Sequence, residues 1–149
     1  MKTLFDLEVF AHTVARIQGL DSSAPRQWGT MTPAQMLEHS SRALEIACGR
    51  GPQKQALIGK LLAWTARKDF IGAKPFSRNG PTGPQLIVKE APDFAQTKTR
   101  LLGLLRELHA MGESGCDGHV HPFFGRMTGT EWGVTQFKHL DHHLRQFGA

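Results

Sequence analysis

The sequence contains only two cysteines, Cys48 and Cys116, among 149 residues. They lie far apart and show no metal-type pairing, so a framework of several disulfides is excluded and one disulfide is the most that can form. Neither cysteine has a histidine at a spacing typical of an activated thiol nucleophile, and both look inert. Such sparse cysteine usage favours a reducing compartment, and we expect a cytoplasmic protein.

Long apolar runs are also missing. No run approaches the ~20 residues that a membrane-spanning helix needs, and the first residues lack the apolar stretch of a secretory signal peptide. We therefore expect no membrane partner. The chain has no internal repeat, no low-complexity tract and no heptad array long enough for a coiled coil. We predict one domain, residues 1–149, with enough chain to bury a core.

Basic residues are in modest excess, with 18 Lys and Arg against 13 Asp and Glu and a formal net charge of +5. They are scattered, and the densest stretches, residues 50–60 and 67–78, are short. Scattered charge is typical of a solvated basic face, so we do not expect nucleic acid as a partner. A basic helical module that binds another macromolecule, with incidental histidines, stays open as an alternative.

Capping boxes, in which a threonine and a Gln or Glu three residues later satisfy the first backbone N–H groups, begin two predicted helices. They are formed by Thr32 with Gln35 and by Thr128 with Glu131. The first predicts a helix over residues 33–48 that stops at Gly49, with proline favourably placed at its first position. The second predicts a helix from about residue 128 to 147.

Apolar residues at helical spacing predict three further helices. They span residues 3–18, residues 54–70, and residues 94–111 between Asp93 as cap and Gly112 as stop. Residues 72–92 contain several Gly and Pro that exclude a long helix. We interpret them as a long crossover loop, with a short strand at 85–89 as the alternative, and residues 112–127 as another loop. These elements predict an all-α fold.

Three histidines lie within five positions of the last predicted helix. His139 and His143 are four residues apart, which places their Cβ atoms on one helical face about 6 Å apart. Two imidazoles there can reach one metal ion, because Zn–N bonds are about 2.0–2.1 Å long. His39 lies in the apolar stripe of helix 33–48 and needs a polar partner if buried. We predict a divalent metal site on His39, His139 and His143, with an open coordination position typical of catalytic sites.

This donor set suits Zn or Ni, and also Co or Fe. A metal with an open position lowers the pKa of a bound water or favours the thiolate form of a bound thiol. The alternative is two histidines near a helix C-terminus, where the dipole favours their cationic form. His142 is the weaker choice of ligand, because it points further round the helix towards solvent.

His121 is the candidate catalytic residue. It precedes Pro122 in the loop before the last helix, and it could act as a fourth ligand, a proton shuttle or a substrate contact if that loop folds over the helices. The alternative is a loop histidine held by its proline, and the role of His119 stays open. Asp141 and Glu38 adjoin predicted ligands in sequence but point elsewhere on their helices, so we favour solvated charges over bonds to an imidazole.

Several motifs carry a family resemblance. They are Met36-Leu37-Glu38-His39 after a Trp-x-x-x-Thr-Pro start, the His139…His143 pair before Arg145-Gln146, and the runs HPFFG (121–125), EWG (131–133) and KHLDHHLRQFG (138–148). The first two resemble the DinB/YfiT-like superfamily of metalloenzymes. The three runs are similar to an uncharacterised bacterial branch of that superfamily.

The resemblance implies a four-helix bundle with a long crossover between its second and third helices. It also implies a metal site on His39, His139 and His143, commonly completed by water, and frequent homodimers. Characterised relatives include transferases that use bacillithiol or mycothiol and mycothiol-dependent maleylpyruvate isomerases. Many relatives read His-Arg-Gly-Gln where this chain has HLRQ (143–146), which leaves the substrate open.

We therefore expect a metal-dependent hydrolase or a low-molecular-weight-thiol transferase, acting on a small-molecule substrate with a thiol as possible cosubstrate. The alternative is a non-catalytic, metal-binding or metal-stabilised dimeric helical bundle.

Overall fold

A computed structural model describes residues 1–52, 54–72 and 74–149 of the chain. The described residues form α1 (Leu7–Gly19), α2 (Pro33–Glu45), α3 (Leu57–Ile71), α4 (Phe94–Cys116), α5 (Gly129–Gln146) and the strands β1 (Val120–His121) and β2 (Gly125–Arg126). Apart from this two-stranded sheet the regular structure is helical. The predicted all-α class is therefore confirmed as a mostly helical chain.

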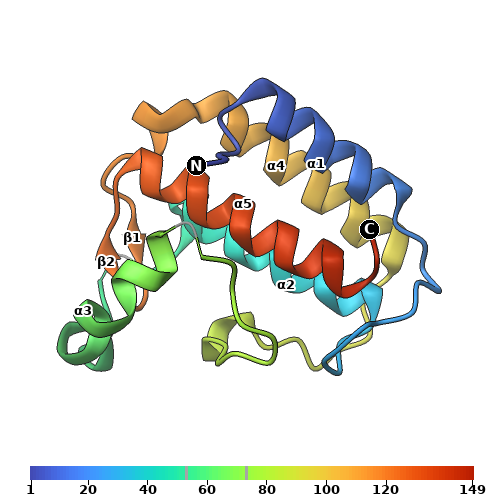
Figure 1. The fold of residues 1–149 in the computed structure, drawn as a ribbon, viewed down its shortest axis with the longest axis horizontal. Helices are drawn as coiled ribbons and strands as arrows, with labels where there is room; N and C mark the ends of the chain where they lie inside the picture. The colour runs from blue at the N-terminus through green and yellow to red at the C-terminus, as the bar shows by residue number, and fades with distance from the viewer. Residues whose placement is uncertain (53, 73) are drawn as a thin grey trace.

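Helices α1, α2, α4 and α5 pack against one another around a shared apolar core (Figure 1). Both α1 and α2 contact α4 and α5, whereas α3 lies to one side and contacts α5. Fully buried core side chains come from each of the four helices, among them Ile17, Leu37, Leu44, Leu101, Leu105, Leu108, Trp132, Leu140 and Leu144. Burial of each such side chain contributes about 1.5–3 kcal/mol, which fixes the helices that carry the histidines.

Both predicted capping boxes form. Thr32 Oγ1 accepts from the Gln35 N–H at 3.2 Å, and Gln35 Oε1 accepts from the Thr32 N–H at 3.0 Å. Thr128 and Glu131 make the same reciprocal pair at 3.2 and 2.9 Å. The first helix starts later than predicted, at Leu7, because the Asp6 side chain caps it.

The helical backbone breaks at both glycines predicted to end helices. Gly112 takes a non-helical φ of 65°, which glycine adopts without steric cost, but a second helical segment that was not predicted follows to Cys116. Helix α2 changes at Ile46 into the π turn Ile46–Arg50, and the helical backbone breaks at Gly49. Gly49 in that turn has a φ of 82°, and a Cβ there would lie 2.9 Å from the His119 ring.

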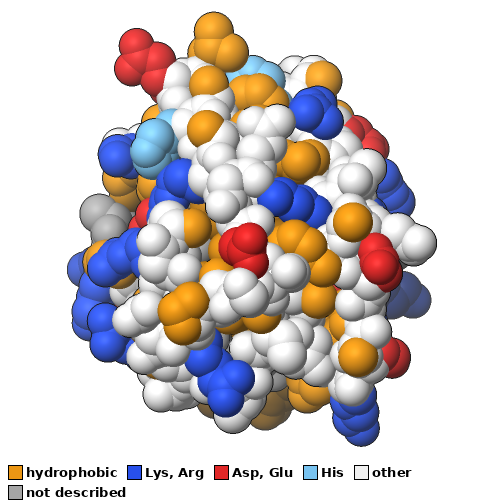
Figure 2. All heavy atoms as spheres, turned by 90° about the vertical axis from the view of Figure 1, so that its right-hand side faces the viewer, with side chains coloured by type: hydrophobic (Ala, Val, Ile, Leu, Met, Phe, Trp, Pro, Cys, Tyr) orange, Lys and Arg blue, Asp and Glu red, His pale blue; other side chains and the backbone are white. Residues whose placement is uncertain are grey.

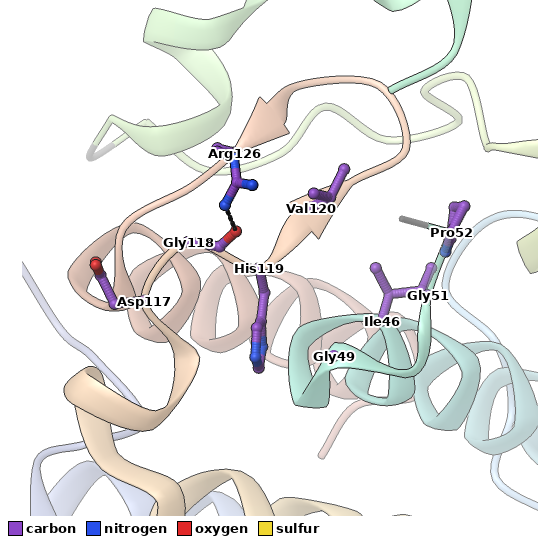
Figure 3. Close-up of a pocket in the computed structure, with 9 residues that line it drawn as sticks. All are labelled: Ile46, Gly49, Gly51, Pro52, Asp117, Gly118, His119, Val120 and Arg126. Carbon is purple, nitrogen blue, oxygen red and sulfur yellow. Dashed lines mark hydrogen bonds between the residues drawn. The ribbon is translucent and has the colours of Figure 1, made fainter. Parts of the chain in front are cut away.

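The segment 112–127 contains more structure than the predicted loop. Strands β1 and β2 pair antiparallel, with Val120 opposite Arg126 and His121 opposite Gly125. His119 Nδ1 donates to the Ala47 carbonyl at 2.8 Å and so joins this hairpin to the π turn (Figure 3). A cavity of about 260 Å³ between turn and hairpin is lined by Ile46, Gly49, Gly51, Pro52, Asp117, Gly118, His119, Val120 and Arg126. The role of His119 is thus to hold two segments together.

The predicted crossover, residues 72–92, runs from α3 to α4 past α2 and α5 (Figure 1), and residue 73 lies outside the described residues. Its described part forms the 3-10 turn Pro84–Leu86 and no strand, so the alternative of a strand at 85–89 is wrong. The Leu86 carbonyl accepts from His39 at 2.9 Å, and the Ile87 carbonyl accepts from Arg42 at 2.9 Å. Two backbone oxygens therefore fasten the crossover to α2.

The surface away from α3 carries mixed side chains. In Figure 2 apolar groups are scattered among basic and acidic ones on this face. Of the helices in the described part of the chain, none combines the length and apolarity needed to cross a bilayer.

Candidate metal centre

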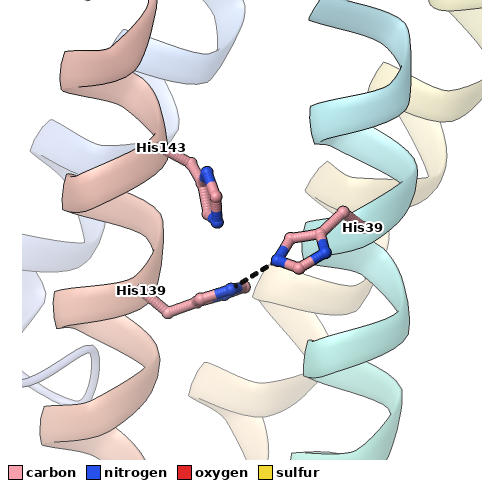
Figure 4. A group of neighbouring side chains, drawn as sticks. All are labelled: His39, His139 and His143. Carbon is pink, nitrogen blue, oxygen red and sulfur yellow. Dashed lines mark hydrogen bonds between the residues drawn. The ribbon is translucent and has the colours of Figure 1, made fainter. Parts of the chain in front are cut away.

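His39 of α2 meets His139 and His143 of α5 in the space between the two helices (Figure 4). One ring nitrogen from each lies within 4.8 Å of the other two. The ring centroids are 4.7 to 4.8 Å apart in all three pairs. The structure thus brings together the three residues that the sequence singled out, from segments about one hundred positions apart.

Burial keeps these imidazoles neutral. His39 is 4% exposed and His143 is 8% exposed. Loss of hydration lowers the pKa of His143 to about 3, with His39 adding to the effect. Burial also lowers the pKa of His39, and it lowers the pKa of His139 well below its ordinary value, assisted by the neighbouring histidines. Neutral imidazole is the form that binds a metal ion, so no proton has to be removed from a cation first.

Hydrogen-bond partners fix the tautomers of two rings. His39 Nδ1 lies 2.9 Å from the Leu86 carbonyl, which can only accept, so Nδ1 carries the proton. His143 Nδ1 donates to Gln146 Oε1 at 2.9 Å, and Gln146 is oriented by its own Nε2, which donates to the Trp28 carbonyl at 2.9 Å. Both rings therefore present an Nε2 lone pair.

The third ring has the opposite tautomer. His139 Nε2 lies 2.8 Å from His39 Nε2, and because the latter holds a lone pair, His139 is the donor. Its Nδ1 is then an acceptor, yet this atom is buried and has no hydrogen-bond partner. A metal ion bound by all three Nε2 atoms would displace the proton that lies between His139 Nε2 and His39 Nε2. His139 would then carry this proton on Nδ1. The donor set fits a divalent metal, with one tautomer change in one ring.

His142 is less exposed than predicted. Its ring lies 5.4 Å from the Trp28 ring, 6.4 Å from the Phe76 ring and 5.0 Å from the His143 ring, measured between centroids. Burial lowers its pKa. The ring is half-buried between Trp28 and Phe76 instead of being fully turned to solvent, and it stays outside the three-histidine group.

His121 also lies outside that group. Strand β1 places its ring among aromatic rings, 4.9 Å from Phe124 and 5.7 Å from Trp132 between centroids. Its Nδ1 accepts from the N–H groups of Phe123 and Phe124, both at 3.1 Å, and burial lowers its pKa to about 4. Its Nδ1 thus holds the hairpin turn, and the neutral ring carries its proton on Nε2.

The two neighbouring carboxylates point elsewhere, as predicted, but they pair with arginines instead of being solvated charges. Asp141 pairs with Arg16 at 2.7 Å, and Glu38 pairs with Arg42 at 2.9 Å. The groups that bond to imidazole Nδ1 atoms are instead the Leu86 carbonyl and Gln146. Gln146 could have been found from its spacing of three residues after His143, whereas a backbone carbonyl leaves no signal in the sequence.

Sequence analysis also missed Lys138. Its Nζ donates to the carbonyls of Asp69, Phe70 and Gly72 at 2.9, 2.8 and 2.6 Å, which satisfies the C-terminal end of α3. Burial lowers the Lys138 pKa, and Asp69 opposes that shift. The residue next to His139 thereby ties α3 to α5.

The cysteines are both free. Burial raises the pKa of Cys48 to about 12 and that of Cys116 to about 11. Thiols with such values are protonated at neutral pH, which agrees with the expectation that both are inert.

Comparison with protein families gives one match. The model of a family described as a protein of unknown function (DUF1569) matches residues 2–149. No curated protein and no solved structure matches the chain.

Proposed function

The chain belongs to the DUF1569 family, whose description assigns no activity, and we propose from its own residues that it binds one divalent metal ion through His39, His139 and His143. The observation that carries this proposal is the convergence of three neutral imidazoles within 4.8 Å, two of them buried and that of His139 half-buried. The unpartnered His139 Nδ1 supports it, because ligation through Nε2 would give this atom a proton to donate. Zn or Ni suits the donors, as do Co and Fe.

We further propose that the protein is an enzyme of the DinB/YfiT-like type, a metal-dependent hydrolase or a transferase of a low-molecular-weight thiol. A bound ion with an open position supplies the acidity that activates a water or thiol. The packing of α1, α2, α4 and α5 with a long crossover agrees with the bundle that the resemblance implies. A small-molecule substrate and a homodimer belong to this proposal.

The chain's own residues have definable parts in such a site. The Leu86 carbonyl and Gln146 hold two rings with their Nε2 atoms facing each other. Phe76 of the crossover lies beside His142, with 6.4 Å between the ring centroids. His121 stays neutral at pH 7 because its pKa is about 4, so it would orient a substrate by donating from Nε2.

Elemental analysis of the full chain, beside thermal melts with and without a chelator, tests the metal site. We expect about one equivalent of metal, a lower Tm after chelation, and loss of both features in His39→Ala. His12→Ala, on an exposed histidine, is the control. Failure to bind any of Zn, Ni, Co and Fe would overturn the proposal.

Activity is a separate measurement. Screens of ester hydrolysis and of thiol addition to electrophiles should give turnover that disappears with the metal. Turnover that survives complete metal loss would contradict the enzymatic part.

One observation favours a second function, a non-catalytic metal-stabilised bundle. His39 and His143 are 4% and 8% exposed and lie between α2 and α5, so an ion bound there would hold two core helices together. Stoichiometric metal that raises Tm without any turnover would support this alternative.

A further inference from the structure

Helix α3 presents its large apolar side chains to solvent. Five of them are 48 to 78% exposed: Leu57, Ile58, Leu61, Leu62 and Trp64. Among the other described residues, only Met1, Leu7 and Ile87 are large hydrophobic residues with comparable exposure. Exposed apolar groups that gather on one element mark an interaction surface, whereas scattered ones do not.

This exposure follows from how α3 is seated. Its inner side consists of small residues, with Gly59 and Ala63 buried against the protein. A Cβ on Gly59 would lie 2.2 Å from the Phe123 carbonyl, so the helix backbone itself rests on the hairpin. Arg67 donates to the Phe124 carbonyl at 2.9 Å and pairs with Glu131 at 2.8 Å. Because α3 packs against the protein through its small residues, its large side chains face outward.

The apolar surface extends beyond the helix. A shallow groove of about 540 Å³ separates α3 from the start of α5. It is lined by Met1, Trp64, Arg67, Lys68, Ile71, Gly72, Thr130, Glu131 and Val134. Met1 is 77% exposed and Trp64 is 77% exposed, so the two side chains extend one apolar surface across the groove.

Basic residues surround this surface. Lys54, Lys60, Lys68 and Lys74 are exposed on or next to α3. Asp69 is the one acidic residue between positions 54 and 74. A helix with Trp and Leu on its outer face and lysines around it has the composition of helices that lie in the interface of anionic membranes.

We propose that α3 rests on an anionic lipid surface, with Leu61 and Trp64 at the boundary of headgroups and acyl chains and the lysines among the headgroups. At 15 residues the helix is about 22 Å long, too short to span a bilayer but able to lie in its surface. The expectation of no membrane partner rested on the lack of a spanning segment, which a surface helix does not need.

Charge distinguishes this partner from a second copy of the chain. Two α3 helices packed face to face would bring Lys60 and Lys68 of both copies together, with Asp69 alone to offset them. Like charges at short range oppose such pairing, whereas anionic headgroups attract each lysine. The apolar and basic features therefore fit one partner, a negatively charged bilayer.

Cosedimentation of the full chain with vesicles tests this directly. Binding to an equal mixture of phosphatidylcholine and phosphatidylserine should exceed binding to phosphatidylcholine alone by about tenfold and should weaken in high salt. Leu61→Glu, at an exposed position, should reduce binding about tenfold or more without lowering Tm. Leu7→Glu is the matched control, because Leu7 is 70% exposed but lies on α1.

Trp fluorescence adds a second measurement. Trp132 is fully buried, Trp28 is partly buried and Trp64 is 77% exposed, so a blue shift on adding anionic vesicles that is lost in Trp64→Phe would report Trp64 entering the interface. Absence of binding to anionic vesicles overturns the proposal. A concentration-dependent dimer that Leu61→Glu abolishes, without vesicle binding, would assign the surface to a second copy instead.

Discussion

Gln136 Oε1 and His139 Nδ1 are buried one helical turn apart on α5, and neither has a hydrogen-bond partner. They are the two such side-chain atoms in the described part of the protein. In the tautomer imposed by His39, His139 Nδ1 is an acceptor, so the two atoms cannot bond to each other. Metal ligation through Nε2 would move the proton to Nδ1, and Gln136, three residues earlier on the helix, offers a buried acceptor without a partner.

Gln136→Leu should therefore weaken metal affinity by about 10–100-fold, the usual effect of removing the partner of a ligating histidine. Gln136→Glu keeps an acceptor and should retain or strengthen binding. Competition with a chromophoric chelator measures both. Gln146→Leu is the benchmark, because Gln146 already bonds to His143 Nδ1. Unchanged affinity in Gln136→Leu would show that His139 Nδ1 finds another partner.

The free energy of unfolding of the metal-free protein should decrease as the pH falls below about 6.5. Unfolded His121 takes up a proton near its ordinary pKa, about 6.5, whereas the folded ring stays neutral down to about 4. Protonation thus favours the unfolded chain below pH 6.5, at about 1.4 kcal/mol per pH unit for each such histidine. Denaturant-induced unfolding in the presence of a chelator, repeated between pH 7 and pH 4, measures how steeply the free energy of unfolding falls with pH.

The variant His121→Asn measures how much of this pH dependence of the free energy of unfolding comes from His121. Its side-chain oxygen can still accept from the Phe123 N–H, but it does not titrate, so the slope should become shallower. Thr65→Asn, at an exposed residue that does not titrate, should leave the slope as in the wild type. An identical slope in both variants would show that His121 does not carry this pH dependence.

Lys138→Met should loosen α3 from α5. The substitution leaves the carbonyls of Asp69, Phe70 and Gly72 without their donor, at a cost of about 1–3 kcal/mol. Hydrogen exchange should accelerate in α3 more than in α2. Lys60→Met, on an exposed lysine, is the control, and equal protection in the two variants would contradict the assigned role.

Both thiols should resist alkylation in the folded protein. With pKa values of about 12 and about 11, Cys48 and Cys116 hold very little thiolate at pH 8. Iodoacetamide should react slowly until denaturant is added, as followed by intact mass. Rapid single modification of the native chain would show a thiol that is more accessible and more acidic than its surroundings indicate.

Local sequence patterns predicted much of what holds the site. The capping boxes at Thr32 and Thr128 set the starts of α2 and α5, and a spacing of four residues placed His139 and His143 on one face. The apolar stripe around His39 turned that ring inward. Each of these features depends on residues within a few positions of one another, which is why the sequence reveals them.

Other features depend on distant segments. A second helical segment follows Gly112, the β1–β2 hairpin forms, and Lys138 reaches α3 only because of packing that no local pattern encodes. The partial burial of His142 was not predicted for the same reason, since Phe76 and Trp28 approach it from other parts of the chain.

The oxygen that orients His39 belongs to the backbone of residue 86. Every amino acid supplies this carbonyl, so the identity of the side chain at that position matters little to the ring. What matters is the number of residues that carry the carbonyl to α2. Insertions or deletions between residues 74 and 92 should therefore harm the centre where point substitutions are tolerated, and chain length in this segment is the property under constraint.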